Sequence, residues 1–177
     1  MIINKYKSQQ GLSLVSVLIA SSISLILGAI GGPALVGSME QARIKGVSEE
    51  VYFFVREARS QAIASSTNID MDVKVGIYWC LGLSDQGNCD CNTANSCKVN
   101  DLEKTISYTD YPSIVLTDVD LGGDFKAQFD GERGLALNDS GSMKFSSPTL
   151  AMRVSLNSLG RTQLCSENGQ IGSYQSC

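Results

Sequence analysis

A long uncharged stretch near the start of the chain is the feature that most limits what this sequence can fold into. No Asp, Glu, Lys or Arg lies between Lys7 and Glu40, and residues 12–36 are almost wholly apolar or small. About 20 consecutive apolar residues are enough for a helix to cross a bilayer. Because Lys5 and Lys7 precede the stretch, the short segment before it is expected to stay cytoplasmic. The sequence therefore predicts a membrane-spanning helix at residues 12–38.

A cleaved secretory signal peptide is the alternative explanation of this stretch. It would require a small-residue cleavage site after the apolar run. The helical pattern instead continues past the run, which favours a retained segment with any processing before it. Small residues also recur at three- or four-residue spacing; either they dilute an apolar run, or they form a stripe on which helices approach closely in lipid. The stripe consists of Ser13, Ser16, Ala20, Ser24, Gly28 and Gly32.

Residues 39–66 have the pattern of an amphipathic helix. Apolar residues recur at three- and four-residue steps, and charged residues such as Glu49 and Arg56 lie between them. The recurring apolar residues are Ile44, Val47, Val51, Phe54, Ala58 and Ala62. We expect this helix to pack its apolar side against a domain formed by the rest of the chain.

Residues 67–177 have the pattern of an antiparallel β domain. Residues 69–75 alternate between apolar and polar side chains, which indicates a half-buried strand, and residues 77–81 are its expected hairpin partner. Residues 85–101 are too rich in Asn, Asp and Gly for regular structure. Further strands are predicted at 105–108, 114–119, 125–129, 143–145, 152–156 and 162–165. The predicted fold class is α+β, a long N-terminal helix packed on an antiparallel β head of two small sheets or a sandwich.

Six cysteines in the β domain favour disulfides. An even number of cysteines behind a membrane-targeting segment is typical of an oxidising compartment. Closing the short Gly-rich segment between Cys165 and Cys177 costs little entropy, so we expect these two to pair. The other four are Cys80, Cys89, Cys91 and Cys97. A zinc site is the alternative for these four cysteines, but they lack paired C-x-x-C spacing. Four cysteines can form two disulfides in three ways, and we expect Cys80 to bond into the 89–97 loop.

The sequence has no evident catalytic chemistry. Histidine is absent, which removes the commonest general base, and no phosphate-binding loop or cofactor motif occurs. Strand alternation places Asp70 and Asp72 on a solvent face. Asp118, Asp120 and Asp124 lack the spacing of an EF-hand calcium loop and are expected in a polar turn. We expect no enzymatic activity, no cofactor and no metal.

The start of the apolar run resembles the type III signal of type IV prepilins. The letters "GLSLV", residues 11–15, follow a short basic leader and begin a long apolar helix. In that family a prepilin peptidase cuts after the glycine and methylates the new amino terminus, which implies cleavage after Gly11 and an N-methylated Leu12. The implied partners are this peptidase, the inner-membrane assembly machinery and other pilins. The implied segments are a leader (1–11), the membrane half of a helix (12–38), its amphipathic half (39–66) and a β head (67–177).

Two positions depart from the usual pilin pattern, the first being Leu12, where most pilins carry phenylalanine. Most pilins carry a glutamate at the fifth mature position, where this chain has Ser16. Serine avoids the cost of a lone carboxylate in an apolar filament core, but losing the glutamate should weaken recruitment into the repeating shaft. The resemblance therefore favours a minor subunit. Residues 54–69 also resemble the helix end and first strand of GspH/FimT-type minor pilins and pseudopilins.

The end of the chain resembles the FimT/FimU-type carboxy terminus. In that group a Gly-Arg turn leads into a strand ending in cysteine, as Gly160 and Arg161 lead toward Cys165. In some DNA-uptake members the turn is Gly-Arg-x-Arg and contacts DNA. Gln163 replaces the second arginine, so DNA binding through Arg161 is expected to be weak. Three further cations would add to it if they shared its face: Arg133, Lys144 and Arg153.

Three functions follow from these resemblances. The first is a minor pilin, anchored in the inner membrane with its head in the periplasm and then assembled into a type IV pilus at the cell surface, where it primes or caps assembly. The second is the corresponding minor pseudopilin of type II secretion. The third is a DNA-binding pilin of a competence pilus. All three have the same expected architecture, so the sequence leaves them open.

Overall fold

The computed structural model describes residues 13–122, 125–136 and 139–177, and within the helix the side chains of residues 30–35 are outside this description. The residues of the sequence predictions that lie outside it are the leader 1–11 with Gly11, Leu12, Gly32 and Asp124. The described residues have an α+β fold with one helix, α1, and ten strands.

The helix α1, Leu14–Ser65, belongs to two units, because the chain divides between Met39 and Glu40. The first unit contains the uncharged residues of the helix, and all of its described side chains are exposed. Among the residues that the structure describes, no helix combines the length and the apolar character needed to cross a membrane. The second unit contains the rest of α1 and all ten strands.

Within the second unit, α1 buries one side, as the sequence predicts. Its buried apolar residues are Ile44, Val47, Val51, Phe54, Val55, Ala58 and Ala62. The helix ends at Ser65, and the next residue, Ser66, has a left-handed backbone (φ 52°). Thr67 N donates to Ala62 O at 3.2 Å and Ser66 N donates to Ile63 O at 3.4 Å. This is the bonding pattern of a Schellman ending, so the last carbonyls are satisfied although the turn has no glycine.

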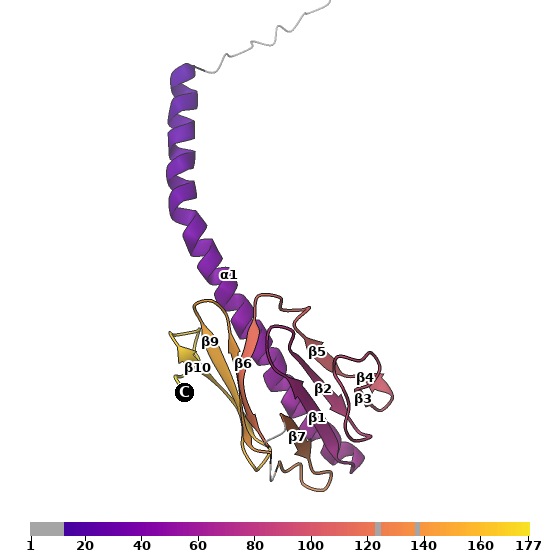
Figure 1. The fold of residues 1–177 in the computed structure, drawn as a ribbon. Helices are drawn as coiled ribbons and strands as arrows, with labels where there is room; N and C mark the ends of the chain where they lie inside the picture. The colour runs from indigo at the N-terminus through magenta and orange to yellow at the C-terminus, as the bar shows by residue number, and fades with distance from the viewer. Residues whose placement is uncertain (1–12, 123–124, 137–138) are drawn as a thin grey trace, which may run out of the picture. The chain divides into compact units, whose positions relative to one another are not determined.

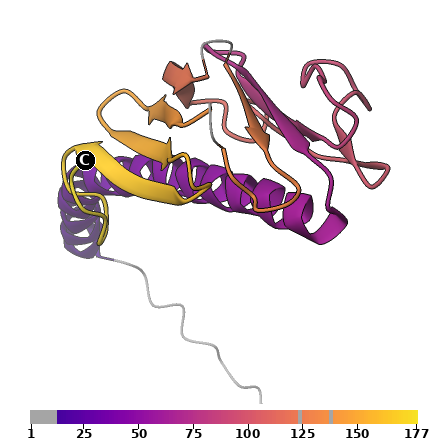
Figure 2. The ribbon, with the colours of Figure 1, turned by 90° about the horizontal axis from the view of Figure 1, so that it is seen from below.

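Two four-stranded antiparallel sheets lie over this part of α1 (Figures 1 and 2). The strand order is β5-β2-β1-β7 in the first sheet and β10-β9-β8-β6 in the second. The strands of the first sheet are β1 (Ile69–Lys74), β2 (Cys80–Ser84), β5 (Thr105–Ser107) and β7 (Lys126–Phe129). Those of the second are β6 (Val115–Leu121), β8 (Gly141–Ser146), β9 (Ala151–Leu156) and β10 (Thr162–Asn168). A small separate hairpin consists of β3 (Lys98–Val99) and β4 (Leu102–Glu103).

Trp79 joins the two sheets in the core. It directly precedes β2 of the first sheet and is fully buried. Its ring lies edge-on against Phe145 of β8 in the second sheet, with 5.3 Å between the ring centroids. The indole Nε1 donates to Ile114 O at 2.9 Å, so the polar atom of this large buried ring is satisfied.

The predicted hairpin partner at residues 77–81 is wrong in its position. The strand β2 begins at Cys80, because the chain first turns at Gly76 and then buries Trp79. Gly76 has φ 112°, and its N and O atoms both bond to Leu116 of the other sheet, at 2.9 and 3.2 Å. These residues therefore connect the two sheets instead of forming a tight hairpin.

The six cysteines form three disulfides: Cys80–Cys91, Cys89–Cys97 and Cys165–Cys177. The last is the pair expected from the sequence, and Cys80 bonds into the 89–97 loop as expected. The thiols considered for zinc are therefore all cross-linked. The loop lies close to β2 at Gly82, where a Cβ atom would be 2.3 Å from Cys97 Sγ. Only glycine leaves space for the cross-linked loop against the sheet.

The prediction that Asp70 and Asp72 share a solvent face is wrong for Asp72. Its side chain is buried, and its Oδ2 atom accepts a bond from Cys91 N at 3.4 Å. The cross-linked loop covers this position, which strand alternation alone does not reveal. Asp118 and Asp120 are a second correction, since both lie inside β6 and not in a turn.

Candidate functional site

The described part of the first unit is an exposed apolar helix. Its large apolar side chains are each more than half exposed: Leu14, Val15, Val17, Leu18, Ile19, Ile23, Leu25, Ile26, Leu27, Val36 and Met39. Exposed apolar surface of this extent marks a site of contact with protein or membrane. It is the first candidate interaction surface of the chain.

The small-residue stripe lies on this helix. Its described members Ser13, Ser16, Ala20, Ser24 and Gly28 are all exposed. Ser24 Oγ donates to Ala20 O at 2.9 Å, and the hydroxyls of Ser21 and Ser22 donate to carbonyls three residues earlier, at 3.0 and 2.9 Å. Because these hydroxyls bond within the helix, the surface can enter an apolar environment without leaving them unpaired.

Two tyrosines attach the second half of α1 to the head. Tyr111 Oη donates to Glu50 Oε2 at 2.5 Å, and Tyr174 Oη donates to Glu49. Burial, together with the bond to the carboxylate, raises the pKa of each phenol to about 12. Each tyrosine therefore remains a hydrogen-bond donor throughout the physiological range of pH.

Glu40 attaches the beginning of the second unit to the turn between β8 and β9. Its Oε1 atom accepts bonds from Ser147 Oγ at 2.6 Å and from Thr149 N and Oγ1, each at 3.0 Å. These bonds, the one from Ser147 first, hold the pKa of Glu40 below its ordinary value. The first charged residue after the uncharged stretch is thus an ionised anchor for the helix.

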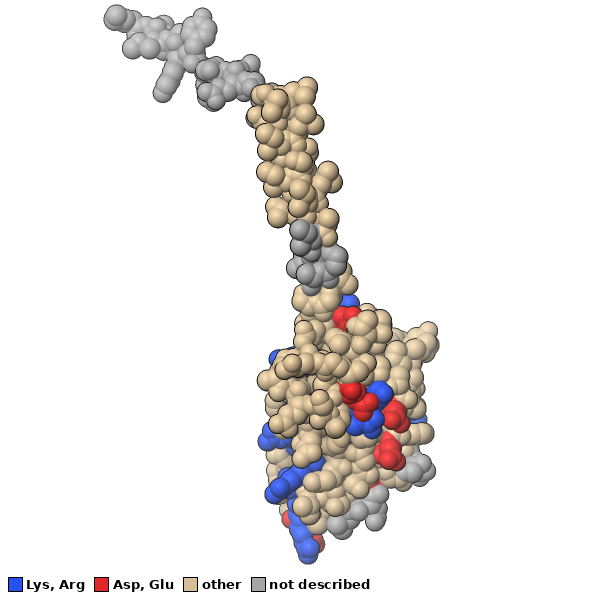
Figure 3. Space-filling model, turned by 90° about the vertical axis from the view of Figure 1, so that its left-hand side faces the viewer, with Lys and Arg blue, Asp and Glu red and all other residues tan. Residues whose placement is uncertain are grey.

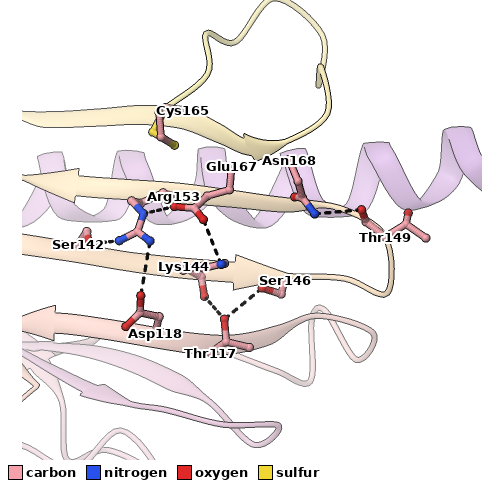
Figure 4. A network of polar contacts seen from close by, with 11 residues as sticks. Thr117, Asp118, Ser142, Lys144, Ser146, Thr149, Arg153, Cys165, Glu167 and Asn168 are labelled. Carbon is pink, nitrogen blue, oxygen red and sulfur yellow. Dashed lines mark hydrogen bonds and ion pairs between the residues drawn. A yellow bond between two sulfur atoms is a disulfide. The ribbon is translucent and has the colours of Figure 1, made fainter.

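A polar network crosses the four strands of the second sheet (Figure 4). Arg153 of β9 donates to Glu167 of β10 and, at 2.7 Å, to Ser142 Oγ of β8, and it lies 3.5 Å from Asp118 of β6. Lys144 Nζ lies 3.0 Å from Glu167 Oε2. The bond to Glu167 raises the pKa of Arg153, and the bonds from Arg153 and Lys144 lower the pKa of Glu167. The positive charges of Arg153 and Lys144 are therefore already paired with carboxylates.

Arg161 lies in a different place, in a groove that two arginines of α1 also line. These are Arg56 and Arg59. Arg59 Nε donates to Gly134 O at 3.1 Å, and Arg56 donates to Tyr52 Oη at 3.3 Å. None of the three arginines forms an ion pair with a carboxylate in the described part of the chain. Figure 3 shows a compact group of red and blue side chains on one face of the head, with further blue side chains nearer the edge of that face.

Gly160 allows the turn before β10 to place Arg161 in this groove. Gly160 has φ 71°, and a Cβ atom there would lie 2.1 Å from Gly134 O, so the close approach requires glycine. Arg161 N donates to Asn157 Oδ1 at 2.9 Å, which fixes the turn. Of the cations considered from the sequence, Arg133, Lys144 and Arg153 do not line this groove.

Sequence reasoning missed Arg56 and Arg59 as neighbours of Arg161. The sequence pattern of this helix places its charged residues only between the apolar positions, although the three-residue spacing of Arg56 and Arg59 puts these two on one helical side. What brings them to Arg161 is the packing of α1 beside the turn before β10, which no local pattern specifies.

A second groove, of about 800 Å³, runs between α1 and β10. Its lining includes Tyr52 and Phe53 of the helix, Leu164 of β10 and Tyr174 of the tail. Tyr52, Thr162 and Gln163 line both this groove and the arginine groove. The two grooves are therefore continuous along the start of β10.

Comparison with known proteins identifies no relative of this chain. No protein-family model, curated protein or solved structure matches it. Its function is therefore inferred from its own residues: the exposed part of the helix and the two grooves of the head.

Proposed function

We propose that the chain is a minor subunit of a type IV pilus, held in the inner membrane before assembly and then incorporated into the filament, where it primes or caps assembly. The observation that supports this most strongly is the contrast along α1. Its described residues before Glu40 are uncharged and exposed, whereas after Glu40 one side of it is buried in the head. Such a helix is suited to association with the helices of other subunits.

The free energy of moving this helix from the membrane into a filament is also compatible with the proposed role. In lipid there is no hydrophobic driving force between helices, so close packing and hydrogen bonding decide whether they associate. A subunit that leaves lipid for a filament core exchanges one apolar environment for another. The stripe of small residues allows close approach, and the hydroxyls of Ser21, Ser22 and Ser24 keep their hydrogen bonds to helix carbonyls in either environment.

Ser16 supports a minor position in the filament. It lies on the exposed stripe and contributes a hydroxyl where most pilins have a carboxylate. Without that carboxylate the subunit cannot form an ion pair with the amino terminus of a neighbour. We therefore expect few copies per filament, with other pilins, prepilin peptidase and the inner-membrane assembly machinery as partners.

Mass spectrometry of the mature amino terminus tests this proposal. Protein isolated from cells should begin at N-methylated Leu12, because Gly11 has no side chain to obstruct the peptidase. Gly11→Val should retain the leader, whereas Ser8→Val, which adds bulk away from the cleaved bond, should be processed normally. An intact Met1 terminus in the wild-type protein would rule the proposal out.

The location of the processed protein then separates a pilus from a secretion filament. Recovery in fibres sheared from the cell surface is expected for a pilus subunit. Recovery of the processed protein only in membranes would instead favour the minor pseudopilin of type II secretion, whose filament stays in the periplasm.

DNA binding is a second candidate function, favoured by the arginine groove. Arg56, Arg59 and Arg161 lack carboxylate partners in the described residues, and guanidinium groups bind phosphate well. Three cations remain fewer than the six to ten phosphate contacts typical of strong binding. We therefore rank this function below filament assembly.

A further inference from the structure

We infer that the open edge of β10 is a docking site for an extended, acidic peptide segment of a partner protein. The inference concerns the head and does not depend on the function proposed above. It combines three features of one surface: unpaired strand edge, apolar wall and uncompensated arginines.

The tail of the chain shows that the edge of β10 accepts an added strand. β10 is the first strand of its sheet, and in the described part of the chain its only strand neighbour is β9. On the other side Ser166 N donates to Gln175 O at 2.9 Å, and Cys177 N donates to Ser166 O at 3.0 Å. Ser166 and Ser176 thus form a parallel bridge. The tail occupies this edge at Ser166, beyond the Thr162–Leu164 part.

The beginning of the same edge is open. In an antiparallel pair, alternate residues direct their N–H and C=O groups toward the partner strand. Because Ser166 directs both groups away from β9, the alternation gives Thr162 and Leu164 the same direction. Among the described residues these outward groups have no bonding partner. An unpaired strand edge of this kind is a template for a further strand.

The groove beside this edge has an apolar wall. Phe53 of α1 is 60% exposed, and Leu164 and Tyr174 are partly buried at the margin of the core. Thr162 Oγ1 is buried and has no hydrogen-bond partner among the residues that the structure describes. The groove volume of about 800 Å³ is sufficient for several side chains of an extended peptide.

The positive charges near the groove indicate that the docked peptide is acidic. The groove is continuous with the arginine groove at the start of β10, where Arg56, Arg59 and Arg161 have no carboxylate partners among the described residues. Carboxylates at one end of a docked strand would receive charge-assisted bonds there. Arg153 also lines the groove, but Glu167 already pairs with it and with Lys144. The acidic side chain in the lining, Glu49, accepts the bond from Tyr174. A peptide fits these features better than duplex DNA, because only a peptide supplies a strand edge.

Fluorescence anisotropy with the full chain in non-ionic detergent micelles, disulfides intact, tests the inference. The probe is a fluorescein-labelled pentapeptide of alternating valine and threonine that ends in two glutamates. A matched probe has lysines in place of the glutamates, and another carries N-methyl groups on alternate backbone nitrogens. Saturable binding is expected for the first probe, with at least tenfold weaker binding for both others, and it should weaken as salt is added.

Substitutions locate the site. Arg161→Ala should weaken the binding of the acidic probe about tenfold, because it removes a charge-assisted bond. Arg133→Ala, an exposed arginine outside the groove, should leave it unchanged. Leu164→Pro removes an outward N–H group and no ladder bond to β9, so it should abolish binding; if this variant does not fold, the N-methylated probe tests the same contact.

Several results would overturn the inference. These are no saturable binding of the acidic probe up to millimolar concentration, equal binding of the lysine probe, or no loss of affinity on N-methylation. A fourth is duplex DNA that binds through Arg161 more tightly than the acidic probe and displaces it, which would assign the groove to nucleic acid. Failure here leaves the processing of the amino terminus unaffected, so the two proposals are tested separately.

Discussion

Removing the Cys165–Cys177 disulfide should lower the free energy of unfolding by about 3 kcal/mol. The bond joins residues separated by 12 positions. For a loop of that size, the loss of chain entropy in the unfolded state corresponds to about 3 kcal/mol at room temperature. Neither cysteine is fully buried, so the double variant Cys165→Ser/Cys177→Ser loses little packing. Most of the expected loss therefore arises in the unfolded chain.

The folded tail offers a reason why the loss should not be much larger. Ile171 is fully buried and Tyr174 donates to Glu49, so the tail has contacts of its own. Ser166 also bonds to it through two main-chain groups. These contacts can persist without the disulfide, which leaves the native state of the variant close to that of the wild type.

Urea unfolding of the full chain in non-ionic detergent measures the effect. The chain has a single tryptophan, Trp79, which is fully buried and reports unfolding through its fluorescence. With a urea dependence of about 1–3 kcal/mol per molar, a loss of 3 kcal/mol shifts the midpoint by roughly 1–3 M. Ser173→Ala, an exposed change within the tail, is the control and should shift it little. A loss below about 1 kcal/mol, or an equal loss in the control, would refute the entropic argument.

Three further predictions follow from the head. Gly82→Ala should destabilise the protein by roughly 1–3 kcal/mol or more, because its Cβ would lie 2.3 Å from Cys97 Sγ; the same urea titration measures this, and a neutral result would contradict the packing argument. Tyr111 and Tyr174 should ionise near pH 12 in a titration of tyrosinate absorbance. Because burial and the carboxylates raise their folded pKa above the ordinary 10, the stability that they contribute is present below pH 10 and is lost between about pH 10 and 12; replacing both by Phe should remove the phase near pH 12. In gel-shift titrations the wild-type chain should bind duplex DNA weakly or not at all at physiological salt, and Gln163→Arg should strengthen binding and steepen its salt dependence; micromolar binding by the wild type would contradict this.

The helix and most strands were predictable because their patterns are local. The amphipathic repeat from Ile44 to Ala62 marks the side of α1 that is buried, since a 3.6-residue period and a single core leave one choice of side. Strand alternation likewise locates β8 and β9, whose apolar residues face the core. These patterns can be read from the sequence without knowing which residues the helix or strand packs against.

The errors occur where a distant segment covers a local pattern. Asp72 has the alternation of a solvent-facing residue but is buried under a loop that two disulfides hold against β2. The start of β2 was misplaced because Trp79 enters the core between the sheets before the strand begins. The arginine groove depends in the same way on the position of α1 relative to the turn at Gly160. Long-range contacts of this kind have no signature in neighbouring residues.

The tail connects the stability of the head with the proposed docking site. Its bonds to Ser166 occupy the part of the β10 edge that follows Thr162 and Leu164, so they limit the length of strand that can be added. The Cys165–Cys177 disulfide keeps the tail in that position. In the variant the tail still rests on the edge through its own contacts, but without the disulfide a longer peptide can displace its last residues from Ser166 at lower cost. The Cys165→Ser/Cys177→Ser variant should therefore be less stable toward urea and yet bind a longer acidic peptide more tightly than the wild type does. A parallel loss of stability and of peptide binding would instead mean that the tail helps to form the groove, since Tyr174 is one of its walls.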